Sequence, residues 1–324
     1  MANKQKHNIL ARGIRGLLSY LSALNQPIIP ETFIFLETPG TLRRKIGSRR
    51  INDITELKIG GKLNVDDISL LRRMASKRLH SLDLSEAEVL DVQLSSCDNN
   101  HTMHPFMFAH SKSLVRLILP LRTLKIDQNA FFDCTKLSEI ILPEGVVAIE
   151  DRAFYGCHSL KSIDIPETVE RIGSYAFAEC RNLENVSLPD TLTHIMTSTF
   201  EGCRSITSIK IPDNITTISV KAFKGCNNIR TIKLPQNIKA IEHAAFEGCS
   251  KLTAIYVLSS NVPLTSHRAF KGCKRSCKVY VPKSTQNEYW LSEFGYFEKI
   301  EEFWQTTIFL QNPIFFETLF SNSL

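Results

Sequence analysis

Six cysteines recur at a fixed interval of 23 residues, and repeated thiols could bind a metal, form disulfides or act as nucleophiles. Zinc binding needs clustered ligands such as C-x2-C, but each of these cysteines falls in a different repeat and no His accompanies it. A catalytic thiol needs a neighbouring base, which the repeat does not supply. We therefore expect buried thiols that act as small apolar groups, with no catalytic residue and no cofactor.

Two other groups of residues could also do chemistry. A seventh cysteine, Cys273, follows the sixth after 24 residues, and a local disulfide with Cys277 is a second interpretation of that pair. The spacing C-x3-H-x2-H could reach one metal ion, whereas the Ser, Asp and Asn residues around it favour an ordinary polar loop without a metal. The residues concerned are Cys97, His101, His104 and His110.

The cysteines belong to a longer repeat, which dominates the chain. The unit is A-F-x-x-C-x-x-L-x-x-I-x-L-P-x-x-V-x-x-I, and an earlier copy has Phe108 with Ser111 in the Cys position. One such unit cannot bury its own apolar face, but stacked units bury a continuous one. We expect the repeated Phe and Cys residues to form the core: Phe131, Cys134, Phe154, Cys157, Phe177, Cys180, Phe200, Cys203, Phe223, Cys226, Phe246 and Cys249.

Each part of the unit predicts its own local structure. The Leu-x-x-Ile-x-Leu part is rich in β-branched residues and ends in strict alternation, which predicts a short strand. Pro lacks the N–H that a central strand needs and ends it. We expect the Val-x-x-Ile part to turn the chain back, and the Ala-Phe part to form a short helical, 3₁₀ or irregular turn on the opposite wall. The predicted fold is a repeat solenoid with a parallel β-sheet on one face.

The spacing divides the chain into four parts. Residues 1–30 fit either a weak secretion signal or an amphipathic helix. Residues 31–104 hold divergent repeats, with a helix over 65–74, opened by Asp66 and Asp67, and an insertion over 85–104. Residues 105–285 form the regular array. Residues 286–324 contain aromatic side chains that could cover the last coil, followed by a Phe-rich tail.

The repeat resembles the BspA-like leucine-rich repeats, a 23-residue class, over residues 105–285. The segment LETPGTLRRKIG, with Ile54–Met74, is similar to the N-terminal region of such proteins, and VYVPKSTQNEYW is similar to their usual final repeat. The resemblance implies a right-handed solenoid with a small helical N-terminal part. It also implies a surface or secreted protein that adheres to host proteins or to other cells.

Solenoids bind partners on the open face of their sheet, so the outward strand positions are the candidate ligand face. Exposed aromatic and Ile side chains can serve as anchors there. The other interpretation is a solvent-exposed surface without a ligand, on which any residue type is tolerated. The positions are Ile118, Ile141, Asp164, Ser187, Lys210, Lys233, Tyr256 and Tyr280.

Composition and charge exclude several other classes of function. The net charge is +6, with +9 in residues 1–80 and −3 in the remainder, but no nucleic-acid-binding motif accompanies the basic segment. No apolar run reaches the ~18 residues of a membrane span, and no phosphate-binding loop, dinucleotide fingerprint or hydrolase motif is present. We expect a non-catalytic protein-binding module, located at the cell surface or secreted. The alternative is an intracellular interaction scaffold in the cytoplasm.

Overall fold

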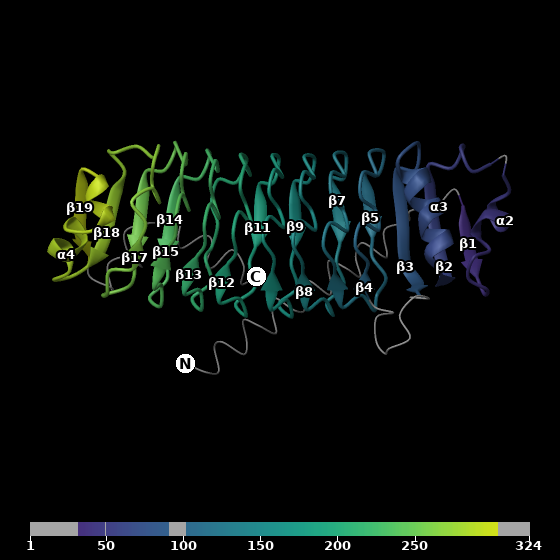
Figure 1. The fold of residues 1–324 in the computed structure, drawn as a ribbon, viewed down its shortest axis with the longest axis horizontal. Helices are drawn as coiled ribbons and strands as arrows, with labels where there is room; N and C mark the ends of the chain where they lie inside the picture. The colour runs from purple at the N-terminus through teal and green to yellow at the C-terminus, as the bar shows by residue number, and fades with distance from the viewer. Residues whose placement is uncertain (1–31, 49, 91–101, 304–324) are drawn as a thin grey trace, which may run out of the picture.

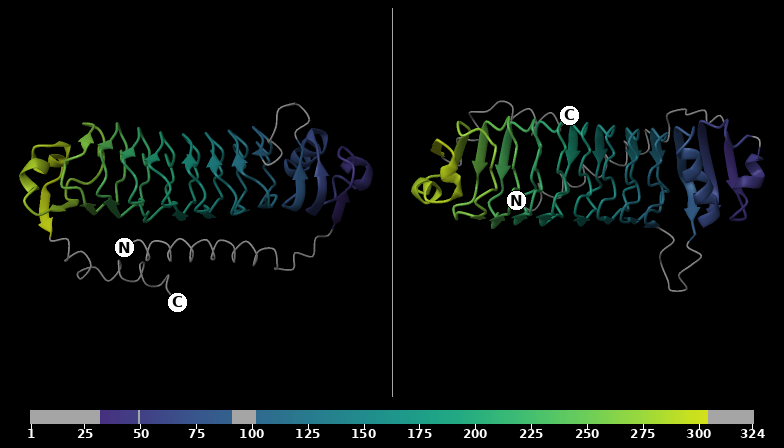
Figure 2. Two further views of the ribbon diagram at one scale, coloured as in Figure 1. Left: turned by 90° about the horizontal axis from the view of Figure 1, so that it is seen from below. Right: turned by 45° about the horizontal axis from the view of Figure 1, so that its top comes forward.

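The computed structural model describes residues 32–48, 50–90 and 102–303. They form an elongated solenoid in which one coil follows the next along the long axis (Figure 1). Figure 2 shows two rows of strands on different walls of this coil. The predicted repeat solenoid with a parallel sheet is confirmed. The expectations for residues 1–30, for Cys97 and His101, and for the tail from residue 304 lie outside the described residues.

The first wall is a parallel sheet built from the Leu-x-x-Ile-x-Leu parts, and we call it the first sheet. Its strands are β1 (Phe33–Leu36), β2 (Glu56–Leu63), β3 (Ser81–Val89), β5 (Arg116–Ile118), β7 (Glu139–Ile141), β9 (Ser162–Asp164), β11 (Asn185–Ser187), β14 (Thr231–Leu234), β16 (Ala254–Val257), β18 (Lys278–Pro282) and β19 (Lys299–Phe303). Hydrogen bonds join them in three stretches: β1-β2-β3-β5-β7, β9-β11 and β14-β16-β18-β19. The 23-residue repeat sets the register, as in the pairing of Arg116 with Glu139.

The second wall is a row of two-residue strands that the sequence analysis did not predict. These strands are β4 (Thr102–Met103), β6 (Lys125–Ile126), β8 (Ala148–Ile149), β10 (Arg171–Ile172), β12 (His194–Ile195), β13 (Thr217–Ile218), β15 (Ala240–Ile241) and β17 (Leu264–Thr265). The Val-x-x-Ile part therefore does more than turn the chain back. Stacking at a constant register places equivalent backbone groups of successive coils side by side, so they pair, as where the Val147 amide donates to the Leu124 carbonyl at 2.8 Å.

The Ala-Phe parts form a wall of turns rather than helices. Each turn is closed locally, as where the amide of Cys157 donates to the carbonyl of Phe154 at 3.1 Å. The repeated Phe rings stack through the interior from Phe108 to Phe270, with successive centroids 5.2–6.0 Å apart. Every repeated Phe and Cys is buried, so stacking of identical side chains fills the core along the axis.

The N-terminal part adds two elements that the repeat pattern did not reveal, β1 and the short helix α2 (Leu42–Ile46). The helix predicted over residues 65–74 is present as α3 (Val65–Ala75), which begins with a capping box between Asn64 and Asp67. The Asp67 carboxylate also accepts hydrogen bonds from the amides of Gly40 at 2.6 Å and Leu42 at 3.0 Å. One buried side chain thus holds the start of α3 against the loop that leads into α2.

The predicted insertion over residues 85–104 is shorter in the structure. β3 continues to Val89 and β4 already begins at Thr102. The extra length of β3 pairs with the similarly long β2, which reaches Leu63. Period-2 alternation breaks down in this stretch because the pairing of β2 with β3 is irregular between Lys58 and Gly60.

The C-terminal end is covered by α4 (Gln286–Trp290), the 3₁₀ helix η2 (Glu293–Tyr296) and β19. Tyr289, Phe294 and Phe297 are buried, and the Phe297 ring lies 5.1 Å from the ring of Phe270, the last member of the Phe stack. These three residues are buried at the coil end, whereas Trp290 is 40% exposed. β19 also extends the first sheet by one strand.

Candidate binding face

The cysteine ladder lies inside the core, and each repeated thiol has an equivalent partner. The Sγ of Cys157 donates a hydrogen bond to the carbonyl oxygen of Phe131 at 3.2 Å, and the equivalent bond recurs from Cys134 to Cys273. We expected these thiols to act only as small apolar groups. They also donate hydrogen bonds to backbone carbonyl groups of the preceding coil. Cys273 and Cys277 are both free thiols, so the local disulfide considered for that pair does not form.

Burial makes these thiols poor nucleophiles and poor metal ligands. It raises the pKa of Cys134 to about 12 and the pKa of Cys157 well above its ordinary value of 9.0. For Cys249, a hydrogen bond with the Cys273 thiol is the largest cause of a raised pKa, followed by burial. The thiolate is the reactive form of cysteine, so a thiol that keeps its proton at neutral pH contributes packing and hydrogen bonding rather than chemistry.

The histidines before the first full repeat do not converge in the part of this segment that the structure describes. His104 is half-buried, and its Nε2 has no hydrogen-bond partner among the described residues. His110 is exposed instead, with its Nδ1 3.2 Å from Oδ2 of Asp133. Within residues 32–48, 50–90 and 102–303, no group of three or more His, Cys, Asp or Glu side chains could hold a metal ion.

Seven of the eight candidate ligand residues lie on strands of the first sheet, and Lys210 lies between β11 and β14, two residues after an isolated bridge that joins Ser208 to Thr231. Strand pairing places Ile118 beside Ile141, and Tyr256 between Lys233 and Tyr280. Equivalent positions of successive coils lie about 4.8 Å apart, so the eight residues form a column with one side chain per coil. We call it the sheet column: Ile118, Ile141, Asp164, Ser187, Lys210, Lys233, Tyr256 and Tyr280.

Ile118 does not belong to the exposed part of the sheet column, and its expected outward exposure is wrong. Its side chain is 1% exposed, because it stands between Asp83 and Ile141 on the neighbouring strands. Ile141, Lys233, Tyr256 and Tyr280 are partly exposed. Asp164, Ser187 and Lys210 are exposed.

The structure extends the sheet column at both ends with residues that the sequence analysis missed. Lys58 and Asp83 precede Ile118 in the same register, and Glu301 follows Tyr280. The Nζ of Lys58 lies 3.8 Å from Oδ2 of Asp83 and 2.6 Å from Oε1 of Glu86. Lys58 and Asp83 each stand between two apolar strand residues, so the same alternation could have identified them. Glu301 has no repeat spacing to mark it.

Two tyrosines of the sheet column stack on each other. The rings of Tyr256 and Tyr280 are stacked with centroids 4.8 Å apart and an interplanar angle of 11°. Beside them, Nζ of Lys278 lies 3.1 Å from Oε1 of Glu301, and hydrogen bonding to that carboxylate raises the pKa of Lys278. The stacked rings hold each other upright, which reduces the rotamer entropy that a partner would have to remove.

Charge is distributed unevenly along this face. The coils of β7 and β9 carry Glu139, Glu144, Asp164 and Glu167 at the sheet or at its edge. Burial, and then repulsion from Glu167 and Asp164, raise the pKa of Glu144, as expected where carboxylates gather. In the coils that follow β11, the sheet-column residues from Lys210 to Tyr280 are basic or aromatic, while Asp213 and Glu301 add negative charge on the same side. We call that part the basic-aromatic half: Lys210, Arg230, Lys233, Tyr256, Lys278 and Tyr280.

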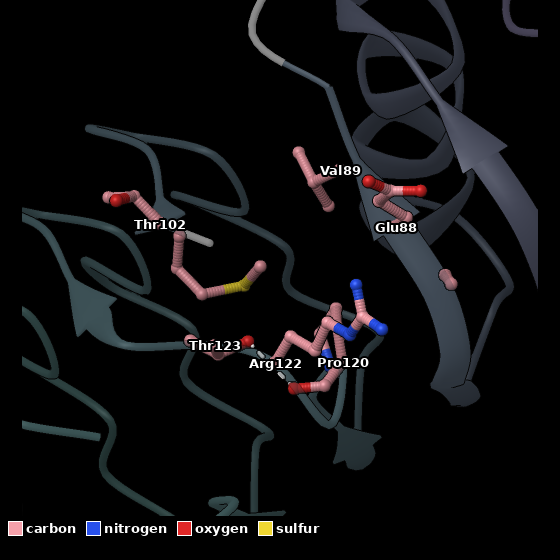
Figure 3. A pocket seen from close by; sticks show the side chains of 8 residues that line it. Glu88, Val89, Thr102, Pro120, Arg122 and Thr123 are labelled. Carbon is pink, nitrogen blue, oxygen red and sulfur yellow. Dashed lines mark hydrogen bonds between the residues drawn. The ribbon is translucent and has the colours of Figure 1, made fainter. Parts of the chain in front are cut away.

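Two hollows lie at the N-terminal end of the solenoid, away from the sheet column. The smaller has a volume of about 20 Å³, enough for about one water molecule, and lies between Glu88 of β3 and the segment around Thr123 (Figure 3). The larger, about 590 Å³, opens beside Phe35, Glu86 and Leu121. Neither hollow includes a residue of the sheet column.

No helix among the described residues has the length and apolar character needed to cross a membrane. A search of curated protein sequences finds no match. Residues 101–226 and 193–318 match the family model described as the BspA type leucine rich repeat region, in six copies. Together these matches cover more than half of the chain.

Solved structures of bacterial leucine-rich repeat proteins are also similar to this chain. A leucine-rich repeat protein from Bacteroides ovatus is 23% identical, with a TM-score of 0.42, over 65% of this chain and 67% of that one. The T. pallidum leucine rich repeat protein is 31% identical, with a TM-score of 0.45, over 50% and 76%. A leucine rich cell surface protein from Faecalibacterium prausnitzii is 18% identical, with a TM-score of 0.31, over 86% and 80%.

Proposed function

Since the chain belongs to the BspA-type leucine-rich repeat family, we propose that it is a non-catalytic module that binds a protein partner through its first sheet. The partner is a host protein or a protein on another cell. The module acts at the cell surface or after secretion, a location that rests on the family resemblance. Residues 105–285 supply the binding array in this proposal, and the segments before and after it close the two ends of the solenoid.

One observation carries the binding role: the inward strand residues keep the same apolar type from coil to coil, whereas the outward residues vary. Inward residues such as Ile163 and Ile255 repeat from coil to coil and are buried. The outward residues Asp164 and Tyr256 occupy equivalent positions in their coils but differ completely in chemistry. A constant interior with a varied exterior is the arrangement in which a repeat scaffold can specify one partner without loss of packing.

The raised pKa values support binding rather than catalysis. The repeated thiols are the most abundant reactive groups of the array, and burial keeps them protonated. The function therefore depends on the shape and charge of the exposed face.

The intracellular scaffold is a second candidate, and the eight free thiols of the described residues are compatible with it. Thiols stay reduced in the cytosol, whereas exposed thiols of secreted proteins are usually oxidised outside the cell. All eight are buried, which protects them from oxidants in either compartment. The two candidates share the binding face and differ only in location.

Photo-crosslinking tests the binding face. A photoreactive amino acid replaces Ser187 on the first sheet or, as the matched control, His194 on the second wall of the same coil; both positions are exposed. We expect crosslinks to a partner protein from position 187 and none from 194. Equal crosslinking from both positions, or crosslinking from 194 alone, would overturn the assignment of the face.

Protease shaving of intact producing cells tests the location. Peptides from residues 105–285, released while cytosolic marker proteins stay intact, are expected for the surface protein. Recovery of these peptides only after lysis would support the scaffold instead.

A further inference from the structure

We propose that the basic-aromatic half binds an acidic peptide segment of the partner protein. This inference rests on the proposed function, because it names the chemistry that the first sheet recognises. The contacts that carry it lie on the coils from Lys210 to Glu301.

The sheet column presents hydrogen-bond donors in this half. Lys210 and Lys233 are followed, one coil at a time, by Tyr256 and Tyr280. The two tyrosine rings stack face to face along the column, and the Tyr280 side chain forms a hydrogen bond with Lys278. Ammonium and phenol groups in a row can donate to successive carboxylate oxygens.

The lysines are available to such a partner. Lys233 has no ion-pair partner among the described residues. Lys210 lies 3.6 Å from Asp190, but the two side chains are 58% and 42% exposed, so solvent screens this pair and an incoming carboxylate can replace it. Lys299 stands beside Lys278 in the strand register and is also exposed, which adds positive charge near the end of the face.

The other half of the same face explains why the segment would bind in one place. Asp164 and Glu167 of the β9 coil repel an acidic ligand, whereas Glu139 of β7 is paired with Arg116 at 2.9 Å. From Lys210 to Tyr280 the sheet column spans three coil intervals, or about 14 Å. An extended segment of about five residues covers that length. The favoured ligand is therefore a short acidic stretch of a protein chain.

Fluorescence anisotropy with the full chain and labelled ten-residue peptides measures this recognition. The probes are a peptide of alternating Glu and Ser, the same peptide with Lys for Glu, and a Gly-Ser peptide. We expect saturable binding of the Glu peptide alone, weakened when the salt concentration rises from 50 to 500 mM. Equal binding of the Glu and Lys peptides, or binding that is insensitive to salt, would overturn the proposal.

Paired variants locate the site. Lys210→Ala with Lys233→Ala should weaken binding of the Glu peptide about tenfold, since two exposed charge pairs are lost. The control, Lys136→Ala with Lys239→Ala, removes the same charge at exposed positions off the sheet column and should leave binding unchanged. An equal loss in both variants would show nonspecific attraction to net charge and would overturn the site.

Competition separates this inference from the proposed function. A partner that crosslinks at position 187 and is displaced by the Glu peptide supports both. A partner that crosslinks there but is displaced neither by the Glu peptide nor by substitution of the two lysines leaves the proposed function standing and overturns the acidic-segment inference. A heparin fragment that binds more tightly than the Glu peptide, with the same variant dependence, would overturn it in favour of a sulfated glycan.

Discussion

The thiol of Cys203 lies 3.0 Å from the carbonyl oxygen of Phe177, 26 residues earlier and one coil away. Both residues are buried, and the same pair recurs in the neighbouring coils, as between Cys180 and Phe154 at 3.2 Å. The repeat thus connects two of its most regular residues across coils, through a side-chain donor and a backbone acceptor. Four predictions test how this contact and other close contacts of the described residues stabilise the solenoid.

Replacement of Cys203 or Cys180 by Ser should destabilise the protein. The shorter C–O bond moves the donor away from its carbonyl, and a hydroxyl is more costly than a thiol to bury without a good partner. We expect a loss of about 2 kcal/mol in the free energy of unfolding, measured by chemical denaturation. An unchanged transition midpoint would contradict the buried, hydrogen-bonded position of the ladder.

The protein should lose stability at alkaline pH. Burial raises the pKa of the folded Cys134 thiol to about 12 from 9.0, so between these values the unfolded chain releases a proton that the folded chain keeps. The contribution of this thiol is complete below pH 9 and declines as the pH rises. Each such thiol should account for a loss of about 1.4 kcal/mol between pH 8 and 10. The Cys134→Ala variant should lose correspondingly less over that range, and parallel pH profiles for the two proteins would contradict this assignment.

Gly61→Ala should destabilise the N-terminal part far more than Gly47→Ala. Both glycines have positive φ angles, 85° and 78°, so both substitutions incur similar backbone strain. A Cβ at position 61 would in addition collide with the Leu36 backbone, whereas none of the described atoms lies within 4 Å of a Cβ at position 47. We expect losses of about 3 kcal/mol or more and about 1 kcal/mol, respectively. Equal melting temperatures for the two variants would contradict the close approach of β2 to β1.

Asp67→Asn should destabilise the protein by about 2 kcal/mol, while Asp66→Asn should have a small effect. The Asp67 carboxylate accepts three backbone hydrogen bonds, from Gly40, Leu42 and Asn64, and an amide group can replace only part of them. Asp66 is exposed in the same first turn of α3. The Asp66→Asn variant is therefore the control for loss of a negative charge near the helix N-terminus. Thermal denaturation followed by circular dichroism measures the difference, and similar shifts for both variants would leave Asp67 with no special role.

The sequence by itself was sufficient to predict the solenoid fold, the length of one coil and the residues of the core. A 23-residue spacing of Phe and Cys determines which residues meet, because stacked copies place identical positions side by side. The same periodicity predicted strands of the first sheet from β2 to β18, but neither β1 nor β19. The acidic pair Asp66 and Asp67 also indicated the start of the helix that the structure contains as α3.

Tertiary structure decided everything that depends on neighbours outside the repeat register. Ile118 occupies an outward position, but the strands beside it bury it. The two-residue strands of the second wall exist only because coils stack, and β19 joins the sheet without any repeat spacing. The partner of each thiol is a backbone carbonyl, which no residue type encodes. Local pattern determines which way a side chain points within its own coil, whereas its burial, its hydrogen bonds and its ion pairs depend on the coils on either side.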